Sequence, residues 1–128
     1  MRLIDGLQVF GLDVSQYAID SAKPEVKPYI SRGCATQLPW ADDHFDFVLS
    51  NGTLHNLSAP RAAKAIKEIE RVGRAKKWVC VESFRNLDEK LNLLAWQLTC
   101  ESFFDPAGWE WLFQQAGYTG DYGFIFFE

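Results

Sequence analysis

The sequence predicts an α/β fold in which a mostly parallel sheet lies between two layers of helices. Short apolar runs of strand length alternate with stretches whose apolar side chains recur at helical spacing. Such alternation is typical of parallel sheets, because each crossover between parallel strands needs a connecting element, usually a helix. Apolar residues make up 48% of the chain, and there is no repeat, low-complexity tract or linker. Residues 1–128 are therefore expected to form one domain.

Five short runs rich in apolar or aromatic residues are expected to form the strands. The third and fourth runs are apolar on both faces, as parallel strands covered by helices on each side are. The expected strands cover residues 7–14, 29–31, 45–50, 77–83 and 122–127, the last as a strand or hairpin.

Four helices are expected, each after a residue that can cap its N-terminus. The expected caps are Ser15, Ser58, Asn86 and Asp105. The first helix is ended by Pro24, the second by Gly73 and the fourth by Gly117. The last three helices carry apolar stripes, which are expected to be Ala62, Ile66, Ile69 and Val72, then Leu87, Leu91, Leu94 and Leu98, then Trp109, Leu112, Phe113 and Ala116.

Charge and cysteine content exclude several classes of function. The net charge of −4 disfavours a nucleic-acid partner, since phosphate binding needs clustered positive charge. The basic cluster of Arg71, Arg74, Lys76 and Lys77 is expected where a helix ends, with cations complementing the helix dipole. No apolar stretch approaches the ~18–20 residues of a membrane span, and the start lacks a signal-peptide layout.

The chain has three widely spaced cysteines and no CxxC pair. Cys34, Cys80 and Cys100 are therefore expected to be reduced thiols in a cytoplasmic protein, and neither a disulfide framework nor a metal site is expected.

The ends of the first three expected strands hold Asp13-Val14, Gly33-Cys34-Ala35 and Ser50-Asn51-Gly52. In open α/β sheets, ligands bind beyond the carboxyl ends of the strands. The Asp13 carboxylate is suited to accept hydrogen bonds from both hydroxyls of a ribose. The small Cys34-Ala35 turn leaves room for a purine edge, and Leu38 could cover one face of the ring. Ser50 and Asn51 would supply polar groups near the reactive end of such a ligand.

The segments V-F-G-L-D-V-S, G-C-A-T-Q-L-P and F-D-F-V-L-S-N-G-T-L-H-N follow one another in this order. Together with E-I-E-R-V, W-V-C-V-E-S and L-F-Q-Q-A-G-Y, the chain from about Val9 onward resembles class I S-adenosylmethionine-dependent methyltransferases. The resemblance implies a three-layer, Rossmann-like fold and S-adenosylmethionine as cofactor. It also implies Asp13 at the ribose and the Cys34-Ala35 turn at the adenine, with Val14, Leu38, Ser50 and Asn51 in the same cofactor site.

The chain departs from the family pattern at two places. The family's first strand and glycine-rich loop have no counterpart before Asp13, so a fold truncated at its N-terminus is expected. The family's common Gly-Asp-Ala at the adenine appears here as Gly33-Cys34-Ala35. Two functions therefore stay open, which are methyl transfer to a small-molecule or unknown acceptor and a non-catalytic binding or oligomerisation module.

The absent strand would leave the Val9 and Phe45 strands with unpaired apolar edges, a state that promotes association. A homodimer is expected, and direct pairing of these two strands is the alternative.

Several single residues have more than one interpretation. Asp13 could cap the first helix together with Ser15. His55 is expected to be a capping or packing residue rather than a general base, and no catalytic residue is assigned. Trp109 is expected in the core, whereas Trp96 and Trp111 are freer to be functional or interfacial. The acidic group of Asp42, Asp43 and Asp46 is expected to form a solvated turn, not a metal site.

Overall fold

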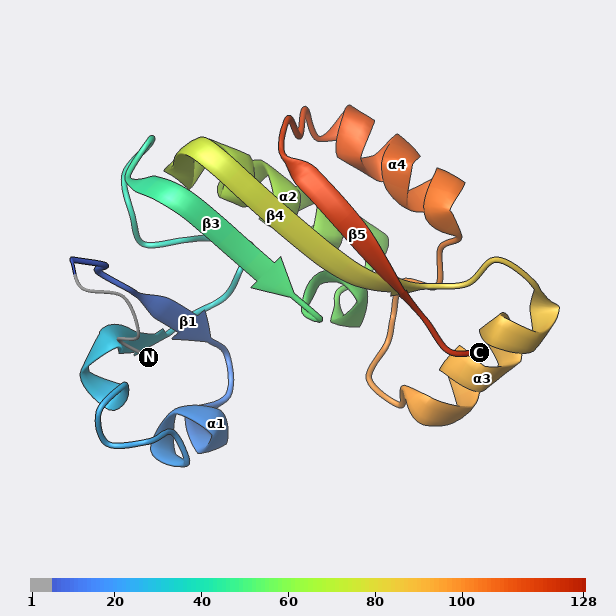
Figure 1. Cartoon of the computed structure of the whole chain (residues 1–128), viewed down its shortest axis with the longest axis horizontal. Helices are drawn as coiled ribbons and strands as arrows, with labels where there is room; N and C mark the ends of the chain where they lie inside the picture. The colour runs from blue at the N-terminus through green and yellow to red at the C-terminus, as the bar shows by residue number, and fades with distance from the viewer. Residues whose placement is uncertain (1–5) are drawn as a thin grey trace. The chain divides into compact units, whose positions relative to one another are not determined.

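A computed structural model describes residues 6–128 and shows an α/β chain whose strand pairings are all parallel (Figure 1). The chain divides into two compact units, Met1–Pro39 and Trp40–Glu128. The strands form a two-stranded sheet in the first unit and a three-stranded sheet in the second. The expected parallel α/β class is confirmed, and each unit is described by itself.

The first unit pairs β1 (Gly11–Asp13) with β2 (Ile30–Arg32). They are connected through the helix α1 (Gln16–Asp20) and the 3-10 turn η1 (Lys27–Tyr29). The expected cap of α1 is confirmed, because the Ser15 hydroxyl accepts the amide hydrogen of Ala18 at 3.2 Å.

β1 is shorter than the strand expected over residues 7–14. Leu7, Val9 and Phe10 lie outside it and are exposed. β2 is only three residues long, and the register pairs Gly11 with Ile30 at the start of both strands. The paired register of this sheet therefore begins at Gly11, and an apolar pattern alone does not make a strand.

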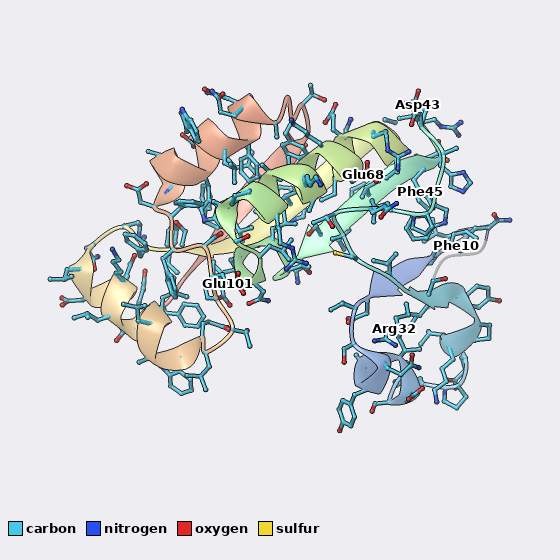
Figure 2. All side chains as sticks on the ribbon, turned by 180° about the vertical axis from the view of Figure 1, so that it is seen from behind. Phe10, Arg32, Asp43, Phe45, Glu68 and Glu101 are labelled. Carbon is cyan, nitrogen blue, oxygen red and sulfur yellow. The ribbon has the colours of Figure 1, made fainter. Side chains whose placement is uncertain are left out.

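The second unit is a sheet with the order β3-β4-β5, and α2 and α4 lie on one of its faces (Figures 1 and 2). Between β3 and β4 come the 3-10 turn η2 and the helix α2, and between β4 and β5 come α3 and α4. The bounds are β3 (Phe45–Asn51), η2 (Leu54–Asn56), α2 (Ala59–Val72), β4 (Gly73–Ser83), α3 (Leu87–Trp96), α4 (Pro106–Gln115) and β5 (Asp121–Phe126).

The core of the second unit lies between α2, α4 and the sheet. Val79 and Val81 of β4 are fully buried and meet the apolar stripes of the two helices. The expected stripes of α2 and α4 are both confirmed, and their buried members are Ala62, Ile66, Ile69, Val72, Trp109, Leu112, Phe113 and Ala116. The opposite face is less covered than expected, since Phe47 and Leu49 of β3 are 56% and 59% exposed.

The stripe expected on α3 is wrong. Its four leucines, Leu87, Leu91, Leu94 and Leu98, are exposed, whereas Leu93 is fully buried. The cap is confirmed, because Asn86 Oδ1 accepts the Glu89 amide at 2.9 Å. Glu89 in turn accepts the Arg85 amide at 2.7 Å, and Glu89 and Leu93, four residues apart, are the buried residues of the helix.

The position expected for the basic cluster is confirmed in part. α2 ends at Val72 with Arg71 in its last turn, and Lys77 Nζ donates to the carbonyl of the C-cap residue Gly73 at 3.1 Å. Arg74 and Lys76 lie in β4, which begins directly at Gly73. Three of the cations also form ion pairs with neighbouring carboxylates, which are Arg71 with Glu68 and Asp42, Arg74 with Asp46, and Lys77 with Glu70.

Candidate functional site

The carboxyl ends of β1 and β2 hold most of the predicted site. The carbonyl of Asp13 accepts the amide hydrogen of Gly33 at 3.0 Å, which joins the two strand ends. Arg32, labelled in Figure 2, donates its Nε hydrogen to the Val14 carbonyl at 3.4 Å. The structure therefore brings Asp13 and Val14 next to the turn that begins at Gly33, at the end of the sheet where ligands bind in folds of this class.

The Asp13 side chain is exposed and has a local role as well. Its Oδ1 accepts the Ser15 amide hydrogen at 2.8 Å, so the carboxylate helps to order the entry into α1. Each carboxylate oxygen has two lone pairs, so Asp13 keeps acceptor capacity for ribose hydroxyls. The two interpretations of Asp13 are thus compatible.

The turn after β2 is tight and made of small groups. A Cβ at Gly33 would lie 2.7 Å from the Leu12 side chain, so a larger residue would require that side chain to move. The carbonyl of Cys34 accepts the Gln37 amide at 3.0 Å, and the Cys34 thiol lies 3.0 Å from the Thr36 hydroxyl. Cys34, Ala35 and Leu38 are half-buried side chains around this turn.

Ser50 and Asn51 end β3, in the second unit. Gly52 follows with a φ of +66° and donates its amide hydrogen to the Cys80 carbonyl at 3.0 Å. Positive φ is readily adopted by glycine, so the chain turns sharply at this point. Asn51 is exposed and Ser50 is half-buried, which leaves polar groups available at the carboxyl end of β3.

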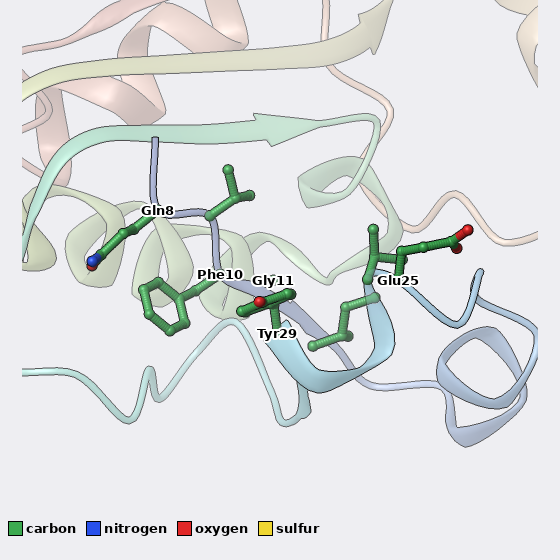
Figure 3. A pocket seen from close by; sticks show the side chains of 8 residues that line it. Gln8, Phe10, Gly11, Glu25 and Tyr29 are labelled. Carbon is green, nitrogen blue, oxygen red and sulfur yellow. The ribbon is translucent and has the colours of Figure 1, made fainter. Parts of the chain in front are cut away.

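A cavity of about 590 Å³ lies in the first unit (Figure 3). It contacts the first residues of β1 and β2, Gly11 and Ile30, and not their carboxyl ends. No predicted site residue lines it, and no pattern in the sequence predicts it. Its lining is mostly apolar and consists of Gln8, Val9, Phe10, Gly11, Glu25, Val26, Tyr29 and Ile30.

A buried polar cluster at the carboxyl ends of β3 and β4 was not foreseen. His55 Nε2 lies 3.1 Å from Glu82 Oε2, and His55 Nδ1 accepts the Glu82 amide hydrogen at 3.3 Å. Burial lowers the pKa of His55 to about 4 and raises the pKa of Glu82, while a hydrogen bond from Gln97 lowers the latter. His55 is 1% exposed and its lowered pKa makes it a weak base, which supports packing over general-base catalysis. The only signal in the sequence is the Glu of the apolar strand W-V-C-V-E-S.

No group of three or more His, Cys, Asp or Glu side chains able to hold a metal ion occurs within residues 6–128. Asp42 and Asp46 pair with Arg71 and Arg74 instead. In that same part of the chain, no helix is long and apolar enough to cross a membrane.

Parallel strands with crossover helices define a Rossmann-like α/β class of fold. A family model described as a methyltransferase domain matches residues 2–81, which is more than half of the 128 residues. The chain belongs to this methyltransferase family. Comparison with curated protein sequences gives no match.

Solved structures support the same fold. The Bacillus subtilis YcgJ protein is similar with a TM-score of 0.63 and 20% identity, over 84% of this chain and 50% of that one. A Haloferax volcanii protein designated a methyltransferase was solved with the Trm112 methyltransferase activator. It is similar with a TM-score of 0.65 and 21% identity, over 84% of this chain and 49% of that one. A Bacillus halodurans protein with the same designation, BH2331, is similar with a TM-score of 0.55 and 18% identity, over 73% of this chain and 52% of that one.

The chain spans about half the length of these solved structures. At 18–21% identity the likeness shows the fold alone, and it confirms the expected Rossmann-like class.

Proposed function

We propose that this chain binds S-adenosylmethionine and serves methyl transfer to a small-molecule or unknown acceptor. The observation that carries this proposal is the junction of β1 and β2, where the Asp13 carbonyl binds the Gly33 amide. This junction places an exposed carboxylate beside a small, tight turn at the carboxyl ends of two parallel strands. A carboxylate that accepts from two hydroxyls and a turn without bulky side chains are the features that a nucleoside needs.

Each predicted residue has a defined role in this proposal. Asp13 binds the ribose hydroxyls, and Val14 continues the wall of the ribose site. Cys34 and Ala35 lie at the adenine edge, and Leu38 covers a face of the ring. Ser50 and Asn51 offer polar groups from the end of β3. The cofactor supplies an activated methyl group, and the transfer depends on alignment more than on a strong base, so no acid or base is assigned.

Calorimetric titration with S-adenosylmethionine and S-adenosylhomocysteine tests the proposal directly. A dissociation constant in the micromolar range, about −8 kcal/mol, supports it. Absence of heat at millimolar ligand with a folded protein contradicts it. The same titration with adenosine alone isolates the nucleoside part of the site.

A second candidate is a non-catalytic methyltransferase-like module that acts by association, in the form of a homodimer. Specific observations favour it, because Phe47 and Leu49 on β3 and the leucine face of α3 are exposed. Exposed apolar side chains gathered on one strand or on one helix face are candidates for an interaction site. We also propose a cytoplasmic location, which the free thiols of Cys34, Cys80 and Cys100 support.

A further inference from the structure

We propose that His55 and Glu82 form an acid-sensitive latch that holds residues 97–102 against the carboxyl ends of β3 and β4. This role does not depend on methyl transfer, so the latch and the proposed function can fail separately.

The backbone of His55 anchors one end of the held segment. Its carbonyl accepts the amide hydrogens of Glu101 at 2.8 Å and of Ser102 at 3.0 Å. The Ser102 hydroxyl donates to the carbonyl of Leu57, and the Thr99 hydroxyl donates to Asn56 Oδ1 at 2.9 Å. Four hydrogen bonds thus fasten the segment to η2 and the residue that follows it.

Glu82 anchors the other end. Its Oε1 accepts a hydrogen from Gln97 Nε2 at 2.6 Å, directly after α3. Its backbone carbonyl accepts the indole hydrogen of the buried Trp109 at 3.2 Å, and its amide hydrogen goes to His55 Nδ1. Glu82 therefore joins the segment, α4 and η2 at one point of β4.

The protonation state of His55 is fixed by this geometry. Nδ1 accepts a hydrogen bond from the backbone of Glu82, so the ring proton of the neutral imidazole lies on Nε2, which faces Glu82 Oε2. A second proton would have to bind Nδ1, where it would meet the Glu82 N–H. Protonation of His55 therefore breaks the bond between η2 and β4.

Among the titratable groups near the latch, Glu82 on β4 faces His55, Glu101 on the held segment is exposed and binds the His55 carbonyl through its amide, and Cys100 lies near Glu82. Gln97 and Trp109 are neutral. Burial and the nearby Glu82 raise the pKa of the Cys100 thiol to about 11, so it stays protonated. Within residues 6–128, Glu82 Oε2 has no hydrogen-bond partner of good geometry, despite the 3.1 Å approach of Nε2. No Lys or Arg in that range pairs with it.

Protonation of His55 and protonation of Glu82 have opposite effects on the opening of the latch. The pKa of His55 is lowered in the closed state, so opening is favoured as the pH falls from 6.5 towards 4. The pKa of Glu82 is raised in the closed state, so its protonation favours closing as the pH falls. Removing one group at a time should therefore reveal pH responses of opposite sign.

Amide hydrogen exchange, corrected for intrinsic rates, measures opening at Glu82, Glu101 and Ser102. With Glu82→Gln, the His55 response is unopposed, and between pH 7 and 4.5 opening should increase on the order of 50-fold for pKa values of 6.5 open and about 4 closed. With His55→Asn, whose carbonyl can still accept a backbone hydrogen, the same acidification should leave opening unchanged or reduce it. Equal increases in both variants, or an increase spread over all amides of β4 and β5, would overturn the latch.

NMR of the His55 imidazole reports its tautomer and its titration without a substitution of His55 or Glu82. The chain has two histidines, and His44→Gln removes the exposed one, which only packs on Phe45. The remaining signal should show the Nε2–H tautomer and no titration between pH 8 and 5.5. Titration near pH 6.5, or the Nδ1–H tautomer, refutes the proposal even if the other variants do not fold.

Discussion

The Asp13 carboxylate has two roles, which are the hydrogen bond from the Ser15 amide and the proposed contact with the ribose hydroxyls. A substitution can separate these roles. Asp13→Ala should weaken S-adenosylhomocysteine binding by about 1.5–3 kcal/mol, the range for a hydrogen bond to a charged group. The loss of the Ser15 amide contact should lower the free energy of unfolding by only about 0.5–1 kcal/mol. Titration calorimetry and urea denaturation measure the two effects.

Asp20→Ala is the matched control for Asp13, because Asp20 lies in α1 and accepts only a side-chain hydrogen from Gln16. It should change stability slightly and leave ligand affinity intact. Unchanged affinity in Asp13→Ala together with a clear loss of stability would assign Asp13 to helix capping alone.

Cys34 is the residue at which the adenine turn departs from the family pattern. Cys34→Asp should tighten nucleoside binding by about 1 kcal/mol or more, because a carboxylate accepts an amino hydrogen far better than a thiol. The half-buried site and the adjacent Thr36 hydroxyl can accommodate the change. Cys34→Ser, which adds no charge, should leave affinity near that of the parent. If the Asp variant folds and binds no better, the adenine does not lie at this turn.

At the scale of elements, α3 is a helix whose buried face the sequence pattern did not predict. Leu87, Leu91, Leu94 and Leu98 recur at helical spacing, yet the buried residues of the helix are Glu89 and Leu93. A hydrophobic stripe tells which residues share a face, but it does not tell which face the rest of the chain covers. On α2 and α4 the stripe and the buried face coincide, and there the sequence was sufficient.

The other differences between prediction and structure also arise because some contacts depend on residues far apart in the chain. The strand around Val9 is curtailed because a strand needs a partner for its backbone groups, and pairing is a long-range property. The capping residues Ser15, Asn86 and Asp105 act within three residues along the chain, so they could be read directly. His55 and Glu82 are 27 residues apart, and their contact depends on the register of β3 with β4.

Two leucines of α3 test its orientation. Leu93→Ala should lower the free energy of unfolding by about 2–5 kcal/mol, the usual cost of a large-to-small change in a core. Leu91→Ala, two residues earlier on the exposed face, should change it by less than about 0.5 kcal/mol. Urea denaturation of both variants decides the matter. A large loss for Leu91→Ala would mean that the leucine face is covered in solution, by another part of the chain or by a second copy.

At the scale of the whole molecule, β1 and β3 each lie at an edge of their own sheet within residues 6–128. Backbone groups along such edges are a template for association. The chain covers about half of the solved structures that share the fold.

The proposed homodimer follows from the exposed edge of β3. Phe47 and Leu49 lie two residues apart and therefore share one face of this strand. Pairing of two β3 edges would bury both side chains together with the backbone groups of the edge. Sedimentation at micromolar concentration should give about twice the chain mass of 14.6 kDa. Leu49→Lys should shift the protein to a monomer, because a charge on an edge strand opposes pairing. Leu91→Lys on α3 is the comparison: dissociation by this variant and not by Leu49→Lys would place the interface on α3, and a monomer at millimolar concentration without any substitution would rule out the dimer.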